Sequence, residues 1–382
     1  MASPRRRLKS SKRKFMSKKK VAKNTLHLLH SDKLIMEILN ASNRYLEQHA
    51  EVREKIEEYD WIFRSLFELI PETVENFWSG HVFPVTEAEY ELECSIVLCK
   101  LGFYKHAIAS LRNVLELGLL SVYWDIDDKS HIDIQNWLKS VESTPFRKDV
   151  FKKLKTNPNI KTLDEKQQIF EKTTALYTRL SNFSHTKGFG YSSRKLNKHR
   201  SNVNSFNEDS LKKYLDLMRG VVEIVTVFHI LKYPVGLQET PIEQKFGLNG
   251  PAGGFIQPHQ VKRIKRLVSK RILEDLQEIS DNDSDAMAMT KWVNGRPDIT
   301  EAEFLAQIEK GDKSSIEMEG FEHWLKNQKK LYKYFEKNKP GEYKEKLEYF
   351  EKLKLWAKEN DHLKEGKFTK LNKQRTTEVT DK

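Results

Sequence analysis

One segment, residues 104–126, constrains the fold more than any other part of the sequence. It reads YKHAIASLRNVLELGLLSVYWDI and carries apolar side chains nearly all round a helical wheel. A helix without a polar face must be covered by other elements on every side. We therefore expect this helix at the centre of a helical bundle.

The sequence on both sides predicts further helices. Apolar residues recur at helical spacing within 25–78, and a long apolar pattern runs over 209–233. Thr86 with Glu89, and Thr162 with Glu165, have the spacing of capping boxes, so we expect helices to begin there. The second of these would carry the segment around 177–185. Because no segment alternates like a strand, the sequence predicts an all-α fold.

Composition shifts divide the chain into five parts. We expect a disordered basic arm over 1–24, a helical bundle over 25–235 and a linker or ordered loop rich in Gly and Pro over 236–258. A smaller helical module over 259–365 would follow, with a helix at 259–279 and a hairpin of helices at 320–336 and 342–358. A frayed tail over 366–382 would end the chain.

The positive charge of the chain is concentrated at its beginning. The net charge is +12, and residues 1–23 contain eleven Lys or Arg and no acid. Such an arm either binds polyanions without sequence preference or is a solvated leader without a partner. No apolar run reaches the roughly 18 residues that cross a membrane. Cys94 and Cys99 lie too far apart on one helix for a disulfide, so we expect a cytoplasmic, reducing location.

A second basic region follows the predicted helix around 177–185. Between Glu171 and Glu208 the chain has no acidic residue. The region alternates bases with aromatic residues, a composition suited to phosphates and unpaired nucleobases. A solvated loop is the other explanation. The residues that we expect to bind nucleic acid are Lys187, Tyr191, Arg194, Lys195, Lys198 and Arg200.

Arg179 and His185 stand six residues apart at the end of that helix. At about 100° per residue they do not share a face, so they would converge only if the last turn is distorted. Asn182 lies three residues from each and could bridge them. From the residues alone, a His in a last helical turn usually complements the helix dipole.

The sequence RLSNFSH at 179–185 resembles the motif of the HEPN superfamily, an Arg and a His near the end of a helix. The helix 104–126 and the segment LYTRLSNFSHTKG resemble the central and motif helices of a bacterial HEPN-like branch, over about 86–235. This resemblance implies a HEPN-like helical bundle and a metal-independent endoribonuclease of the toxin or phage-defence kind. It also implies a homodimer that pairs two motifs.

The resemblance implies a role for each motif residue. His185 would handle the proton of the 2′-hydroxyl or of the leaving group, and Arg179 would stabilise charge on the phosphate. Asn182 would position one of these groups. Arg112 and Glu116, an i, i+4 pair in the central helix, are either a structural ion pair or a polar wall beside the motif helix.

No other segment has the residues of a cofactor or metal site. Residues 281–292 start like a calcium loop but lack its Gly and Glu, and 247–255 has glycines without a phosphate-loop Lys. We therefore expect RNA as the partner, and no cofactor, metal or membrane. One alternative is a non-catalytic module that binds RNA or a partner protein. Another is a structural protein whose C-terminal hairpin makes the interactions.

Overall fold

The computed structural model describes residues 30–71, 80–127, 130–251 and 253–368, and in these ranges it contains helices and turns but no strand. The predicted all-α class is confirmed. The expected basic arm at 1–24 and residues 369–382 of the expected frayed tail lie outside the described residues. Among the described residues, no helix combines the length and apolar character that a membrane crossing requires.

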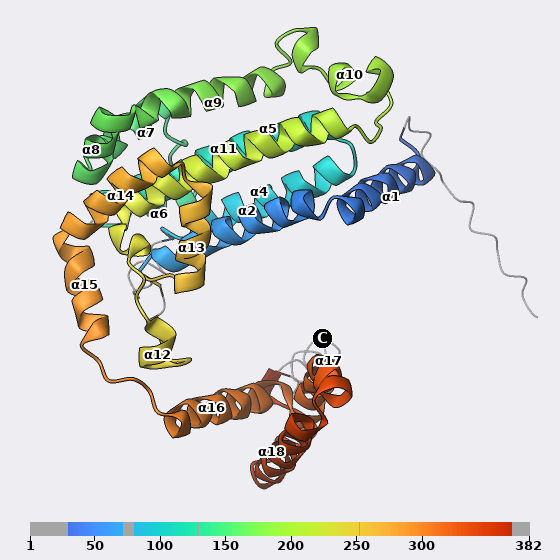
Figure 1. Cartoon of the computed structure of the whole chain (residues 1–382), viewed down its shortest axis with the longest axis vertical. Coiled ribbons are helices and arrows are strands. Elements are labelled where there is room, and N and C mark those ends of the chain that lie inside the picture. Colours follow the sequence, from blue (N-terminus) through green and yellow to red (C-terminus); the bar gives the residue numbers. More distant parts are fainter. Residues whose placement is uncertain (1–29, 72–79, 128–129, 252, 369–382) are drawn as a thin grey trace, which may run out of the picture.

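Six long helices build the bundle (Figure 1). They are α1 (Asp32–Gln48), α2 (Ala50–Leu69), α4 (Phe83–Lys100), α5 (Tyr104–Trp124), α9 (Ile169–Ser184) and α11 (Glu208–Lys232). The short helices α6 (Ile132–Leu138), α7 (Arg147–Leu154) and α8 (Pro158–Gln167) connect α5 to α9. Between α9 and α11 lie η1 (Phe189–Tyr191), α10 (Ser193–Leu196) and η2 (Lys198–Arg200).

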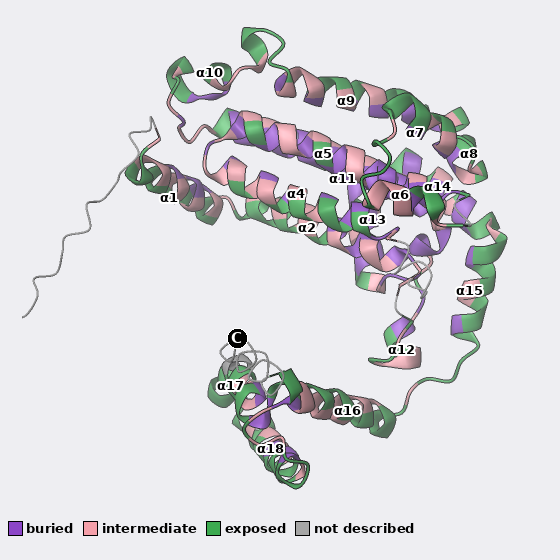
Figure 2. Ribbon diagram, turned by 180° about the vertical axis from the view of Figure 1, so that it is seen from behind, coloured by how far each residue is buried: buried purple, intermediate pink, exposed green. Residues whose placement is uncertain are grey.

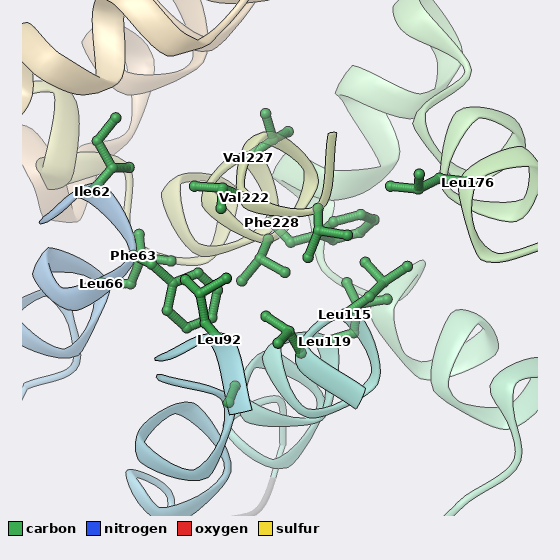
Figure 3. Packing of buried hydrophobic residues seen from close by; sticks show 14 of the residues in the cluster. Ile62, Phe63, Leu66, Leu92, Leu115, Leu119, Leu176, Val222, Val227 and Phe228 are labelled. Carbon is green, nitrogen blue, oxygen red and sulfur yellow. The ribbon is translucent and has the colours of Figure 1, made fainter. Parts of the chain in front are cut away.

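Helix α5 occupies the centre of this bundle, as its apolar circumference predicts. It packs against α4, α9 and α11, and most of its residues are buried (Figure 2). Gly118 allows the close approach to α11, because a Cβ there would lie 2.6 Å from the Cγ1 atom of Val225. Figure 3 shows the resulting core, in which side chains of α2, α4, α5, α9 and α11 meet.

Both predicted capping boxes are wrong. Helix α4 begins at Phe83, and the Thr86 hydroxyl donates to the backbone oxygen of Phe83 (2.9 Å) inside the first turn. Thr162 lies within α8, whose N-cap is Asn157, and α9 begins only at Ile169. Pro84 in the first turn starts α4 earlier than predicted. Pro158 starts the separate helix α8, and Gln168, at a φ of 53°, ends α8 before α9 begins.

The bundle core extends further along the chain than expected. The helix predicted at 259–279 is two helices, α13 (Pro258–Leu267) and α14 (Lys270–Asn282), and buried residues of both belong to the bundle core. In the described part of the expected linker, 236–251 and 253–258, the chain completes η3 (Pro234–Leu237) and forms α12 (Ile242–Phe246). Helix α15 (Ser284–Asn294) then packs against η3 and α14. Its buried residues Ala286 and Val293 join Val235, Ile242 and Phe255 in a small cluster of their own, apart from the bundle core.

The last three helices form their own small core. They are α16 (Glu301–Glu319), α17 (Phe321–Asn338) and α18 (Pro340–Glu359), and α17 with α18 is the hairpin that the sequence predicts. Helix α16 is an additional helix that the periodicity analysis missed. The buried residues of this core are Ile316, Phe321, Trp324, Phe350, Leu353 and Ala357.

Candidate active site

The end of α9 lies against α5, and the two helices bring a polar cluster together. His185 is the C-cap residue of α9, and Tyr177 lies two turns earlier on the same helix. Both contact Arg112, which α5 presents from the opposite side. The sequence separation between Arg112 and His185 is 73 residues, so only the packing of α5 against α9 makes this contact.

Arg112 is the hub of this cluster. Its Nη1 atom lies 3.2 Å from Nε2 of His185, and its Nη2 atom donates to the Tyr177 hydroxyl at 2.7 Å. Its Nε atom donates to Oε1 of Glu116 at 3.0 Å, and the Tyr177 hydroxyl donates to the same oxygen at 2.6 Å. Because a guanidinium only donates, Nε2 of His185 accepts here and the ring proton lies on Nδ1.

The cluster keeps Arg112 charged and oriented. Burial lowers the pKa of Arg112, but Glu116 and Tyr177 raise it by more, and the net pKa lies above its ordinary value. The pKa of Tyr177 is raised by burial and by its hydrogen bond to Glu116. The side chain of Arg112 is 23% exposed and His185 is exposed, so this charge remains accessible to a ligand.

Two cavities open on either side of Arg112. One, of about 450 Å³, lies between α4, α5 and the residues 144–151, and Tyr177 closes part of it. The other, of about 630 Å³, is more open and includes Phe103, His106 and Ser184 in its lining. Arg112 therefore lines both spaces, and Ser184, the neighbour of His185 in the chain, lines the second.

The structure does not bring Arg179 and His185 together. Arg179 lines a different cavity, of about 340 Å³, between α9, α11 and α14. Burial and the charges of Arg179 and Lys195 lower the pKa of Lys213 on α11, so these three cations share one surface. The distortion required for convergence is absent, because α9 stays helical to Ser184. The side chain of Asn182 bridges nothing among the described residues.

The basic residues after α9 lie on the outside of a folded segment. Leu196 is buried and fixes this segment to the bundle, while Lys187, Arg194, Lys195, Lys198 and Arg200 are exposed. Tyr191 differs from the expectation, because it is half-buried and packs edge-on against Phe183 at 5.0 Å. Phe189 is the exposed aromatic residue here, 49% accessible, with the Arg200 guanidinium 5.7 Å from its ring centre.

Sequence reasoning missed three residues of this region. Tyr177 was overlooked, although its spacing of eight from His185 places both near one helical face. Lys213 belongs to α11 and lies after Glu208, outside the segment without acidic residues that the sequence analysis considered. Arg147 precedes that segment, and its guanidinium lies 4.7 Å from the centre of the Tyr177 ring. No sequence signal marks Lys213 or Arg147, because each depends on the packing of separate helices.

Among the described residues, no group of three or more His, Cys, Asp or Glu side chains has the arrangement of a metal site. No family model matches the chain, and comparisons with curated proteins and with solved structures find no match either. The HEPN resemblance therefore depends on the motif and the two helices that carry it.

Proposed function

We propose that the protein acts on RNA as a metal-independent endoribonuclease whose centre is Arg112 with His185, in place of the Arg179–His185 pair that the HEPN resemblance implies. The observation that carries this proposal is the 3.2 Å contact between Arg112 Nη1 and His185 Nε2 beside an open cavity. An imidazole can accept the proton of a 2′-hydroxyl, and a guanidinium next to it can stabilise the charge that builds up on the phosphate during cleavage.

In the proposed reaction, the contact between Arg112 and His185 is the state of the site before the substrate binds. When a phosphate enters, Arg112 turns its Nη1 donor from His185 to a non-bridging oxygen. His185 Nε2 then accepts the proton of the 2′-hydroxyl, and the 2′-oxygen attacks phosphorus while the bond to the 5′-oxygen breaks. The leaving oxygen takes a proton from solvent, which gives a 2′,3′-cyclic phosphate and a 5′-hydroxyl end.

The surroundings support a polyanionic substrate. The exposed bases of 187–200 follow His185 directly, and Arg179, Lys195 and Lys213 add a cationic surface on the neighbouring side of α9. Such groups hold a phosphate backbone without reading its sequence. The resemblance further suggests a homodimer and a toxin or defence role, in which the cytoplasmic protein attacks cellular or invading RNA.

Cleavage of a defined single-stranded RNA in excess EDTA tests the proposal. We expect the wild-type protein to produce cyclic-phosphate ends, and His185→Ala to lose at least about 100-fold in rate. His259→Ala is the matched control, because His259 is also exposed but lies on α13, outside the basic segment 187–200. We also expect overexpression of the wild type, but not of His185→Ala, to be toxic. Equal cleavage by the wild type and His185→Ala would overturn the proposal.

A second candidate is a module that binds RNA without cleaving it. The observation that favours it is the ion pair of Arg112 with Glu116 (3.0 Å), which already occupies part of the guanidinium. For such a module, RNA affinity persists in His185→Ala and falls steeply with salt, as phosphate contacts require. Affinity without any cleavage by the wild type would select this candidate.

A further inference from the structure

The cavity beside Arg112, on the side of α4 and residues 144–151, has no part in the proposed cleavage step. Its volume of about 450 Å³ lies in the range of sites that hold a small organic ligand. Its lining combines charged residues with apolar and aromatic ones. The apolar and aromatic lining includes Leu117, Leu119, Leu120, Trp137, Val150 and Phe151.

Two arginines and one ring form the floor next to the proposed centre. The guanidinium carbons of Arg112 and Arg147 lie 4.9 and 4.7 Å from the centre of the Tyr177 ring. Arg147 makes ring contacts with Tyr177 and Phe151, but no ion pair or hydrogen bond with the described part of the chain. Its five N–H donors are therefore available to a ligand.

Two carboxylates stand on the α4 side of the cavity. Glu87 and Glu91 are one turn apart and both line it. Neither forms a hydrogen bond or a salt bridge within the described residues. Glu91 is the more enclosed of the two, since it is half-buried while Glu87 is exposed. A ligand that fits here must offer donors to a carboxylate and acceptors to an arginine, on a flat apolar body.

We propose that this cavity is a nucleobase subsite that takes guanine. Guanine offers O6 and N7 as acceptors, which an arginine such as Arg147 can bind with two N–H groups. Its N1–H and N2–H₂ groups are donors that the carboxylate of Glu91 can accept. Adenine lacks the O6 acceptor, and the pyrimidines lack N7 and a second ring, so only guanine uses both sets of groups.

The proposal of a guanine subsite rests on the proposed function, because Arg112 belongs both to this cavity and to the proposed cleavage centre. The same guanidinium lines the cavity and contacts His185. A nucleotide whose base occupies the cavity would therefore have its phosphate within reach of the cleavage centre. Cleavage would occur next to guanosines and not at random positions along the RNA.

Calorimetric titration of the full chain with the four nucleoside 3′-monophosphates tests the subsite independently of cleavage. We expect guanosine monophosphate to bind about tenfold or more tightly than the other three. Glu91→Gln and Arg147→Ala should each remove that preference. Glu93→Gln and Lys148→Ala are the matched controls, because these exposed neighbours do not line the cavity.

The outcomes separate the two proposals. A guanosine preference that Glu91→Gln abolishes supports the subsite, even if the wild type cleaves no RNA and the nuclease proposal fails. Equal affinity for all four nucleotides, or no binding of any, overturns the subsite. RNA cleavage without preference for guanosine, seen by sequencing the product ends, would leave the nuclease proposal standing and overturn the subsite as well.

Discussion

Helix α5 carries two polar clusters, about 17 Å apart along its axis, and they differ in their access to solvent. At the first, Arg112 and Glu116 have side chains 23% and 38% exposed and meet the exposed His185. At the second, the C-cap residue Asp125 is 16% exposed and pairs with His81, which is 2% exposed. One cluster is open and the other is closed.

Asp125 has three partners in the closed cluster, of which His81 is one. Asp125 accepts a hydrogen bond from the Tyr233 hydroxyl and lies 3.4 Å from the ammonium group of Lys232. His81 in turn lies 2.9 Å from a ring nitrogen of His131. Burial and Asp125 raise the pKa of Tyr233 well above its ordinary value. The comparison indicates that the closed cluster is held inside the fold, while the open one is accessible to a ligand.

The largest expected effect is on the open cluster. Arg112→Lys retains the charge but cannot hold Glu116, Tyr177 and a phosphate together, so we expect RNA cleavage to fall about 100-fold. Arg64→Lys is the control, because Arg64 also pairs with carboxylates but lies on α2 away from the cluster. If both variants retain wild-type rates, the open cluster has no catalytic part.

A substitution in the closed cluster should lower the free energy of unfolding and leave the rate of RNA cleavage unchanged. Asp125→Ala leaves the ammonium of Lys232 and the Tyr233 hydroxyl without their acceptor, so we expect about 3 kcal/mol less unfolding free energy. Glu116→Gln, in the open cluster, should lose less than about 1 kcal/mol because its partners stay near solvent. Urea denaturation at neutral pH measures both. A larger loss for Glu116→Gln would reverse the assignment of the two clusters.

The pH dependence of the free energy of unfolding tests the buried character of the region around the closed cluster. Burial lowers the pKa of His229, near the closed cluster, from 6.5 to about 4. Between these values the unfolded chain binds a proton that the folded chain does not. Stability therefore falls as the pH drops from 6.5 to 4, by on the order of 3 kcal/mol, and levels off below 4. His229→Leu should remove this part of the slope, and an unchanged slope in that variant would contradict it.

The smallest expected effect concerns Arg179. Because it lies with Lys195 and Lys213 and not with His185, we expect Arg179→Ala to change the cleavage rate by less than about threefold. RNA affinity should fall modestly, and the slope of log affinity against log salt should decrease by about one, as for a single lost phosphate contact. Filter binding over a salt series measures this slope.

The sequence was sufficient for the helices that periodicity defines. The central position of α5, the extent of α11 within one residue at each end and the α17–α18 hairpin were all predicted. The starts of α4 and α9 were not. Pro84 begins α4 before Thr86, whereas Asn157 and Pro158 begin a separate helix, α8, which Gln168 ends at a φ of 53° before α9 starts. A proline, an N-cap residue and a capping-box pattern can each start a helix, and the sequence alone does not show which of them does so.

The candidate site was predictable only in its parts. His185 and the Arg112–Glu116 pair were identified separately, but the guanidinium that meets His185 was assigned to Arg179. Within one helix the angular spacing already argued against Arg179 and His185 sharing a face. The contact of Arg112 with His185 depends on how α5 and α9 are rotated against each other. That rotation is determined by the packing of the whole core, so no local sequence motif predicts it.

A double-mutant cycle of RNA cleavage tests the central claim most directly. If Arg112 and His185 act as one unit, the variant carrying Arg112→Ala and His185→Ala should be no slower than the slower single variant. Arg179→Ala should instead add its small effect to that of His185→Ala. Additive losses for Arg112 and His185, or a loss for Arg179→Ala as large as that for His185→Ala, would contradict the account.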